Sequence, residues 1–210
     1  MKNLAFVIIA VLSILAISCK KNSEDPVPTA KADYFKLKVG NYWIYQGFRI
    51  DTNGVVTPTS QYDSAHIEKD TIIRGFTYYK LLEDPYVLGS VQFPNYLRDS
   101  SGYLVNSYGY ILASDVNFTD TLEVKTGEGQ LYMAYTKMTG KDSVVTIPAG
   151  SLQSITNRMQ VVPLPPNTQN YPIRYSYDIY GKGVGKMKSH TFFWSGLMQL
   201  EARLVRYKVQ

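Results

Sequence analysis

A glycine-rich stretch, DIYGKGVGKMKSH (178–190), is where phosphate-binding chemistry could be expected. A dinucleotide-binding loop needs G-x-G-x-x-G followed by a helix, but Lys186 occupies the third glycine position. A loop of the G-x-x-x-x-G-K-[ST] type would need glycine at Tyr180 and serine or threonine at Met187. The residues that follow alternate as in a strand, so no helix N-terminus is predicted to hold an anion. We therefore expect no nucleotide, and a bend or bulge between strands at Gly181 and Gly183.

A second candidate is HIEKD, where His66, Glu68 and Asp70 occupy alternate positions. On a strand they would share a face, and one histidine with two carboxylates can bind a divalent metal. The alternative is a solvated strand face beside a turn, and the only other histidine is His190. We therefore predict no metal and no cofactor.

The remaining polar pairs do not form a catalytic pattern. Ser189 and His190 are adjacent, so on a strand they would point to opposite faces, and the chain contains no G-x-S-x-G motif. Glu83 and Asp84 lead into Pro85, as turns do. Glycosidases need two facing carboxylates about 5–10 Å apart, which nothing in the sequence indicates. We predict that the protein is not an enzyme.

Aromatic side chains on a β surface can stack on sugar rings. The weak candidates for this ligand-binding role are Trp43, Tyr108, Tyr110 and Trp194. The alternative is core and cross-strand packing, which needs aromatic residues in any β protein.

The start of the chain has the features of an export signal. Lys2 is followed by the apolar stretch Leu4–Ile17, which as a helix would reach about 21 Å, short of a hydrocarbon core of about 30 Å. Ser18-Cys19, with the only cysteine, resembles the lipobox of bacterial lipoproteins. The resemblance implies cleavage before Cys19 and its acylation, which would anchor the chain in a membrane. Because Lys20 replaces the aspartate of inner-membrane retention, it implies the outer membrane, with the periplasmic or cell-surface face left open.

Five later stretches carry a wider resemblance. They are YFKLKVGNYWIYQ (34–46), DTIIRGFTYYKL (70–81), VTIPAGSLQSITNRMQVV (145–162), YGKGVGKMKS (180–189) and LVRYKV (204–209). Together they resemble a group of uncharacterised Bacteroidetes lipoproteins with a Lys-Val-Gly-Asn-x-Trp opening, a Pro-Ala-Gly turn and a late Gly-Val-Gly turn. The resemblance implies a β-rich domain at the cell envelope and no established catalytic residues.

Four hydroxyl residues follow aspartate and precede an apolar residue: Ser64, Thr71, Thr121 and Ser143. These sites resemble Bacteroidetes O-glycosylation signals, which makes them modification candidates. The alternative is that this tripeptide is how a strand leaves a turn.

The elements that must position these residues are strands. All 18 tyrosines lie from Tyr34 onward, and turn signals such as Asn53-Gly54 recur at short intervals. Along 173–179, apolar and aromatic residues alternate with Arg174, Ser176 and Asp178, as in a strand with one solvated face. The alternation slips at Leu204-Val205, which predicts a bulge. We predict an all-β fold: an antiparallel curved sheet, sandwich or open barrel, with at most one or two short helices.

The expected organisation is a lipoprotein signal peptide (1–18), a flexible tether (19–33) and a single β-rich domain (34–210). The net charge of +5 is mild and no run of Lys or Arg exceeds two, so nucleic acid is not an expected partner. We predict a lipid-anchored envelope protein with a non-catalytic binding or scaffold role, whose partner besides the outer membrane is a glycan or an envelope protein. The alternatives are a carbohydrate-binding surface lipoprotein for glycan uptake, and a hydrolase that uses carboxylates or a metal.

Overall fold

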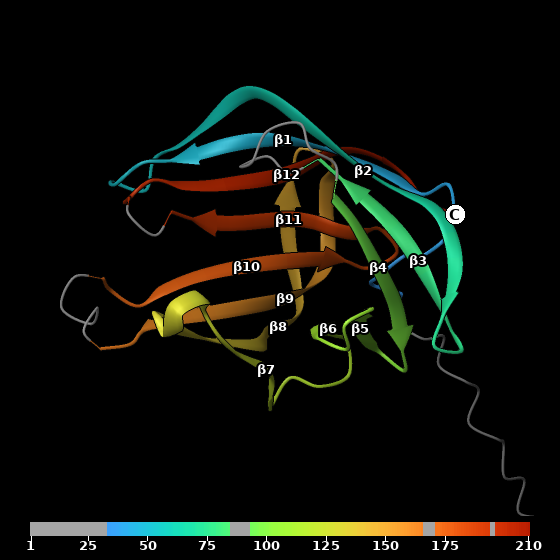
Figure 1. The fold of residues 1–210 in the computed structure, drawn as a ribbon. Coiled ribbons are helices and arrows are strands. Elements are labelled where there is room, and N and C mark those ends of the chain that lie inside the picture. The colour runs from blue at the N-terminus through green and yellow to red at the C-terminus, as the bar shows by residue number, and fades with distance from the viewer. Residues whose placement is uncertain (1–32, 85–92, 166–170, 194–195) are drawn as a thin grey trace, which may run out of the picture. The chain divides into compact units, whose positions relative to one another are not determined.

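The computed structural model describes residues 33–84, 93–165, 171–193 and 196–210, and within them twelve strands form one antiparallel sheet (Figure 1). The strands are β1 (Tyr42–Ile50), β2 (Val56–Ile73), β3 (Phe76–Glu83), β4 (Phe93–Ser100), β5 (Tyr103–Asn106), β6 (Ile111–Ser114), β7 (Thr121–Thr126), β8 (Tyr132–Ile147), β9 (Gly150–Pro163), β10 (Arg174–Gly181), β11 (Gly185–Phe192) and β12 (Gln199–Lys208). The described residues hold one helical element, the 3-10 turn η1 (Glu128–Gln130). The all-β prediction is confirmed. No helix in this described part of the chain is long and apolar enough to cross a membrane.

The sheet is two meanders joined at their ends. Its order is β6-β5-β4-β3-β2-β1-β12-β11-β10-β9-β8-β7, so the first and last strands of the chain pair in the middle of the sheet. The sheet curves until its edge strand β6 approaches the opposite edge (Figure 1), which makes it a nearly closed barrel. Of the three predicted architectures, the open barrel is the one observed.

Side chains close the gap between the two edges. The Ser114 N–H of β6 donates to Met138 Sδ at 3.3 Å, and the Ile111 N–H donates to the Glu123 carboxylate at 3.4 Å. The side-chain amide of Asn157 donates to the backbone carbonyl of Leu112. These contacts satisfy backbone groups that an open sheet edge would otherwise present to another chain.

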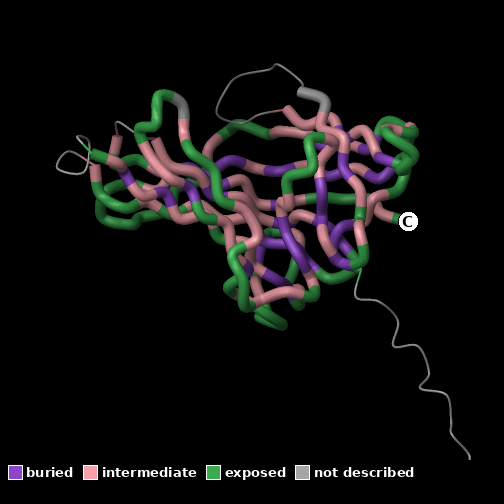
Figure 2. The backbone as a smooth tube through the Cα atoms, turned by 60° about the horizontal axis from the view of Figure 1, so that its bottom comes forward, coloured by how far each residue is buried: buried purple, intermediate pink, exposed green. Residues whose placement is uncertain are grey.

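The core fills the inside of the curved sheet, where buried residues alternate with more exposed ones along the strands (Figure 2). The largest fully buried apolar side chains are Ile67, Met138, Ile155, Met187 and Leu204. This alternation arises because successive side chains of a strand point to opposite faces, so one face of each strand meets the core.

Three short motifs of the sequence make contacts that join strands distant in the chain. The glycine-rich stretch forms the predicted bend between β10 and β11, where the indole N–H of Trp43 donates to the Val184 carbonyl at 2.7 Å. Ala149, in the Pro-Ala-Gly turn between β8 and β9, donates its N–H to the Leu204 carbonyl at 3.1 Å. The β1–β12 register skips the residue after Leu204, so the predicted bulge is also present. The motifs therefore hold the fold together.

Candidate functional site

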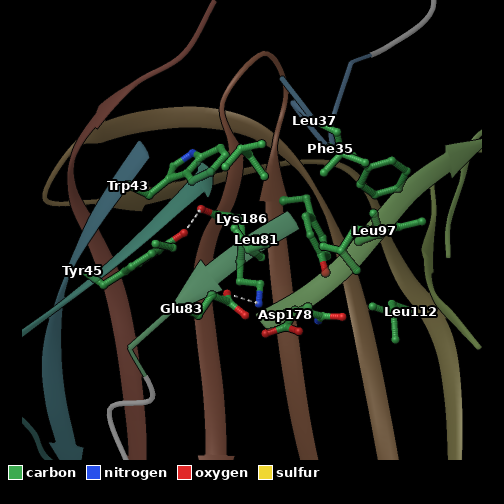
Figure 3. Close-up of a pocket in the computed structure, with 15 residues that line it drawn as sticks. Phe35, Leu37, Trp43, Tyr45, Leu81, Glu83, Leu97, Leu112, Asp178 and Lys186 are labelled. Carbon is green, nitrogen blue, oxygen red and sulfur yellow. Dashed lines mark hydrogen bonds and ion pairs between the residues drawn. The ribbon is translucent and has the colours of Figure 1, made fainter. Parts of the chain in front are cut away.

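A cavity of about 210 Å³ lies inside the curved sheet (Figure 3). Most of its wall is apolar or aromatic and includes Phe35, Leu37, Trp43, Leu81 and Leu97. Residues from both halves of the sheet line it, because β1 and β3 face β10 and β11 across the interior. A cavity of about 150 Å³ with apolar walls holds benzene, so this space is large enough for a small organic molecule.

Polar groups gather at one end of the cavity (Figure 3). Lys186 of β11 places its Nζ 3.1 Å from a carboxylate oxygen of Glu83, the last residue of β3. The hydroxyl of Tyr45 donates to the backbone carbonyl of Lys186 at 2.9 Å. Asp178 of β10 lines the same end of the cavity. Apolar walls with a few convergent polar groups are the usual composition of a small-molecule site.

Burial and neighbouring charges shift the pKa values of the groups at the polar end of the cavity. Burial opposes the charged form of Lys186, but the nearby carboxylates of Glu83 and Asp178 outweigh it and raise its pKa well above the ordinary value. Burial is also the main reason that the pKa values of Tyr45 and Tyr180 are raised. At neutral pH the site therefore presents a protonated amine and neutral phenols, and an amine held in this form is not a nucleophile.

Asp178 differs from the other charged groups of the cavity. Among the described residues, its side chain has no hydrogen bond and no cation within ion-pair distance. Glu83, by contrast, is paired with Lys186. Since one ammonium faces two carboxylates, the polar end of the cavity carries an excess of negative charge.

A bulge in β11 places Lys186 inside the barrel. Tyr180 pairs with Lys186 and Ile179 pairs with Lys188, so the β10–β11 register skips Met187. Without this extra residue the two lysines would share a face, because side chains two apart on a regular strand point the same way. With it, Lys186 lines the cavity and Lys188 points to the outer face of the sheet.

On that outer face Lys188 joins a cluster centred on Glu201. Its Nζ lies 2.6 Å from the Glu201 carboxylate, to which Arg203 donates at 2.5 Å and the Tyr177 hydroxyl also donates. Burial alone would raise the pKa of Glu201, but these donors lower it. The ring of His190 stacks on Tyr177 with centroids 4.6 Å apart. Every charge in this cluster has a partner, which is typical of a structural network.

The strand 173–179 has the predicted burial at Ile179, which is 7% exposed, but the predicted pattern does not hold along its whole length. Asp178 lines the interior cavity, whereas Ile173 and Tyr175 are 48% and 44% exposed. The expectation that the polar side of this strand faces water is therefore wrong at Asp178. The reason is that the sheet curves around a cavity with polar groups at one end, and this position of β10 lines that cavity.

The aromatic candidates separate into buried and exposed residues. Trp43 is 4% exposed and lines the cavity, so it is not a surface platform for a sugar ring. Tyr108 and Tyr110 are 82% and 42% exposed, with ring centroids 6.5 Å apart, and Lys125 Nζ lies 3.9 Å from the Tyr110 ring. Trp194 lies outside the described residues.

The histidine–carboxylate group does not assemble into a ligand set. The β2–β3 register skips Glu68, which instead forms an ion pair with Lys80 at 2.6 Å. Neither His66 nor Asp70 lines the interior cavity. Across the described ranges, no three His, Cys, Asp or Glu side chains are grouped closely enough to hold a metal ion. Ser189 and His190 lie on opposite faces of β11, as their register partners Asp178 and Tyr177 show.

The modification candidates differ in accessibility. Thr121 and Ser143 are exposed, while Ser64 and Thr71 are half-buried. The Ser64 hydroxyl also donates to the Asp84 carboxylate at 2.8 Å. Cys19, the predicted lipid-attachment residue, lies outside the described residues.

Comparison with known proteins identifies the fold but no family. No family model and no curated protein matches the chain. Two solved structures are similar to it, each over 84% of this chain and 99% of its own. One is a provisionally assigned exported protein with a YmcC-like fold from Bacteroides fragilis NCTC 9343, at 11% identity and a TM-score of 0.54. The other is a provisionally assigned lipoprotein from Parabacteroides distasonis ATCC 8503, at 10% identity and a TM-score of 0.52, and the chain shares its fold with both.

Proposed function

We propose that this protein is a lipid-anchored protein of the cell envelope that binds a small, largely apolar molecule inside its open barrel. The observation that carries the binding role is the interior cavity of about 210 Å³, with apolar walls and polar groups at one end. The anchor in the outer membrane rests on the lipobox-like Ser18-Cys19. The two proteins that share the fold, described as exported and as a lipoprotein, support the same location.

A binding role without catalysis fits the chemistry of the cavity. Lys186 is paired with Glu83 and its pKa is raised, so it offers positive charge and hydrogen bonds rather than an activated amine. The cavity phenols Tyr45 and Tyr180 stay neutral because their pKa values are raised as well. These groups can orient a ligand, and none of them is poised to attack one.

The test uses Trp43, which lines the cavity, as an internal reporter. The acylated protein in phosphatidylcholine vesicles is titrated with N-phenyl-1-naphthylamine, a neutral apolar dye, and energy transfer from tryptophan is measured. We expect saturable transfer above the signal of protein-free vesicles. Filling the cavity by Ala65→Leu should weaken dye binding at least tenfold, whereas Val144→Leu, at an exposed position, should leave it unchanged.

Thermal unfolding of each variant checks that it folds, and Leu81→Phe serves as a second filling substitution. Absence of saturable transfer in the wild-type protein would refute the proposed function. Unchanged binding by a folded cavity-filled variant would place the dye elsewhere and refute it too.

A further inference from the structure

We infer that the molecule bound in the cavity is an amphipathic amine, whose ammonium group pairs with Asp178 and whose hydrocarbon part contacts the apolar walls. This inference rests on the proposed function and specifies the ligand class. It begins from Asp178, which among the described residues is the cavity-lining charge without a hydrogen bond or ion pair. Asp178 is half-buried, so its carboxylate is only partly solvated, and a cationic ligand group would supply the partner that the described side chains do not.

The electrostatic potential at the polar end of the cavity is negative, because two carboxylates and one ammonium group line it. Lys186 and Glu83 compensate each other at 3.1 Å, which leaves the charge of Asp178 in excess. That charge contributes to the raised pKa of Tyr180 and to the raised pKa of Lys186, so it acts on the groups around it. A ligand ammonium would complete the set, giving two cations and two carboxylates.

The same arrangement disfavours a carboxylate ligand. Its charge would lie near Asp178 and Glu83, and its one attractive partner, Lys186, already donates to Glu83. An alcohol can donate a hydrogen bond to Asp178 but leaves its charge uncompensated. Because a buried ion pair needs both a counter-charge and good hydrogen bonds, the expected order of affinity is amine, then alcohol, then carboxylate.

The shape of the cavity adds an apolar requirement. Figure 3 shows Asp178, Glu83 and Lys186 together, with Phe35, Leu37 and Leu97 away from them. The cavity of about 210 Å³ exceeds the space that benzene needs, so it can hold a small hydrocarbon group. The ligand is therefore one polar group on a short hydrocarbon.

The test compares ligands that differ only in the polar group. Hexylamine, hexanol and hexanoate are used to displace N-phenyl-1-naphthylamine from the vesicle-bound protein at neutral pH. We expect hexylamine to displace the dye at a concentration at least tenfold lower than hexanol, with hexanoate the weakest. Asp178→Asn should abolish the advantage of the amine over the alcohol. Asp70→Asn, an exposed carboxylate that does not line the cavity, should retain it.

The outcomes separate the two proposals. Equal displacement by the three compounds, or strongest displacement by hexanoate, would overturn the amine inference and leave the cavity as an apolar binding site. An amine preference that persists in Asp178→Asn would also overturn it. If the dye shows no saturable binding to the wild-type protein, the proposed function fails and the inference fails with it.

Discussion

At the scale of single residues, Asp63 is a carboxyl group that folding makes harder to ionise. Burial and the nearby charge of Asp84 raise its pKa from 3.8 to about 6. A raised pKa means that the folded state binds the proton more tightly than the unfolded state. The ionised side chain therefore lowers stability above about pH 6, and this penalty disappears as the pH falls below 3.8.

Asp63→Asn should remove this penalty. A shift of one pKa unit corresponds to about 1.4 kcal/mol, and partial solvent exposure reduces the effect, so we expect a gain of about 1 kcal/mol at pH 8. Urea unfolding at pH 8 and pH 3.5 measures it, and the gain should vanish at the lower pH. An equal gain at both pH values would mean that packing, rather than charge, is responsible.

The residues of the cavity illustrate what a sequence can and cannot predict at this scale. Glu83 stands before Asp84 and Pro85, a context typical of a turn, yet it is the last strand residue and points into the barrel. Asp178 alternates with apolar neighbours as a solvated residue would. The Lys186 partner of Glu83 lies 103 positions away, and most residues around Asp178 in the cavity come from other strands, so no local pattern indicates either environment.

At the scale of elements, the turn between β10 and β11 depends on a close approach to Trp43. Gly183 and Gly185 both have positive φ, 74° and 98°. A Cβ on Gly185 would lie 3.1 Å from a ring atom of Trp43, whereas a Cβ on Gly183 would meet nothing within 4 Å. The two glycines thus share a backbone requirement and differ in packing.

Alanine substitutions at Gly183 and Gly185 therefore separate the effect of positive φ from the effect of packing against Trp43. Gly183→Ala should cost about 1 kcal/mol of unfolding free energy, because alanine disfavours positive φ. Gly185→Ala should cost about 2 kcal/mol more, because the buried indole cannot move away without losing its hydrogen bond to Val184. Chemical unfolding followed by tryptophan fluorescence measures both. Equal losses of unfolding free energy in the two variants would show that the close contact between residue 185 and Trp43 does not affect stability.

Strands, turns and the bulge after Leu204 were predictable because each depends on residues close in sequence. The bulge at Met187 was not, although it decides which lysine enters the barrel. KMKSH alternates without interruption, and an extra residue in a strand is set by how β10 and β12 pair with it. The all-β class was therefore accessible from the sequence, and the interior charge cluster was not.

At the scale of the whole molecule, the barrel is closed by side chains where its edges meet. Met138 is fully buried and its sulfur is the acceptor for the Ser114 N–H of β6. A sulfur acceptor is weak, but a buried N–H without any acceptor costs about 1–3 kcal/mol. The seam between β6 and β8 thus depends on one thioether that a residue of similar volume cannot replace.

Met138→Leu keeps the volume and removes the acceptor. We expect the Ser114 amide to exchange its hydrogen about tenfold faster, while amides of β1 and β12 keep their protection. Hydrogen exchange followed by NMR measures this residue by residue. Met133→Leu, on the same strand but only half-buried, is the control. Unchanged exchange at Ser114 would show that the seam does not depend on the sulfur.

Because β1 pairs with β12, the first and last strands of the chain lie in the middle of the sheet, and its edge strands come from the middle of the sequence. The N–H of Gln210, the last residue, donates to the Asn41 side chain at 3.0 Å, so the last residue of the chain meets the residue just before β1 in the middle of the sheet. The two edge strands of the sheet, β6 and β7, are consecutive in sequence. The strand order is therefore a circular permutation of a simple meander, cut at its centre. The central seam of the sheet needs both β1 and β12, so the two halves can join only after β12 has been synthesised.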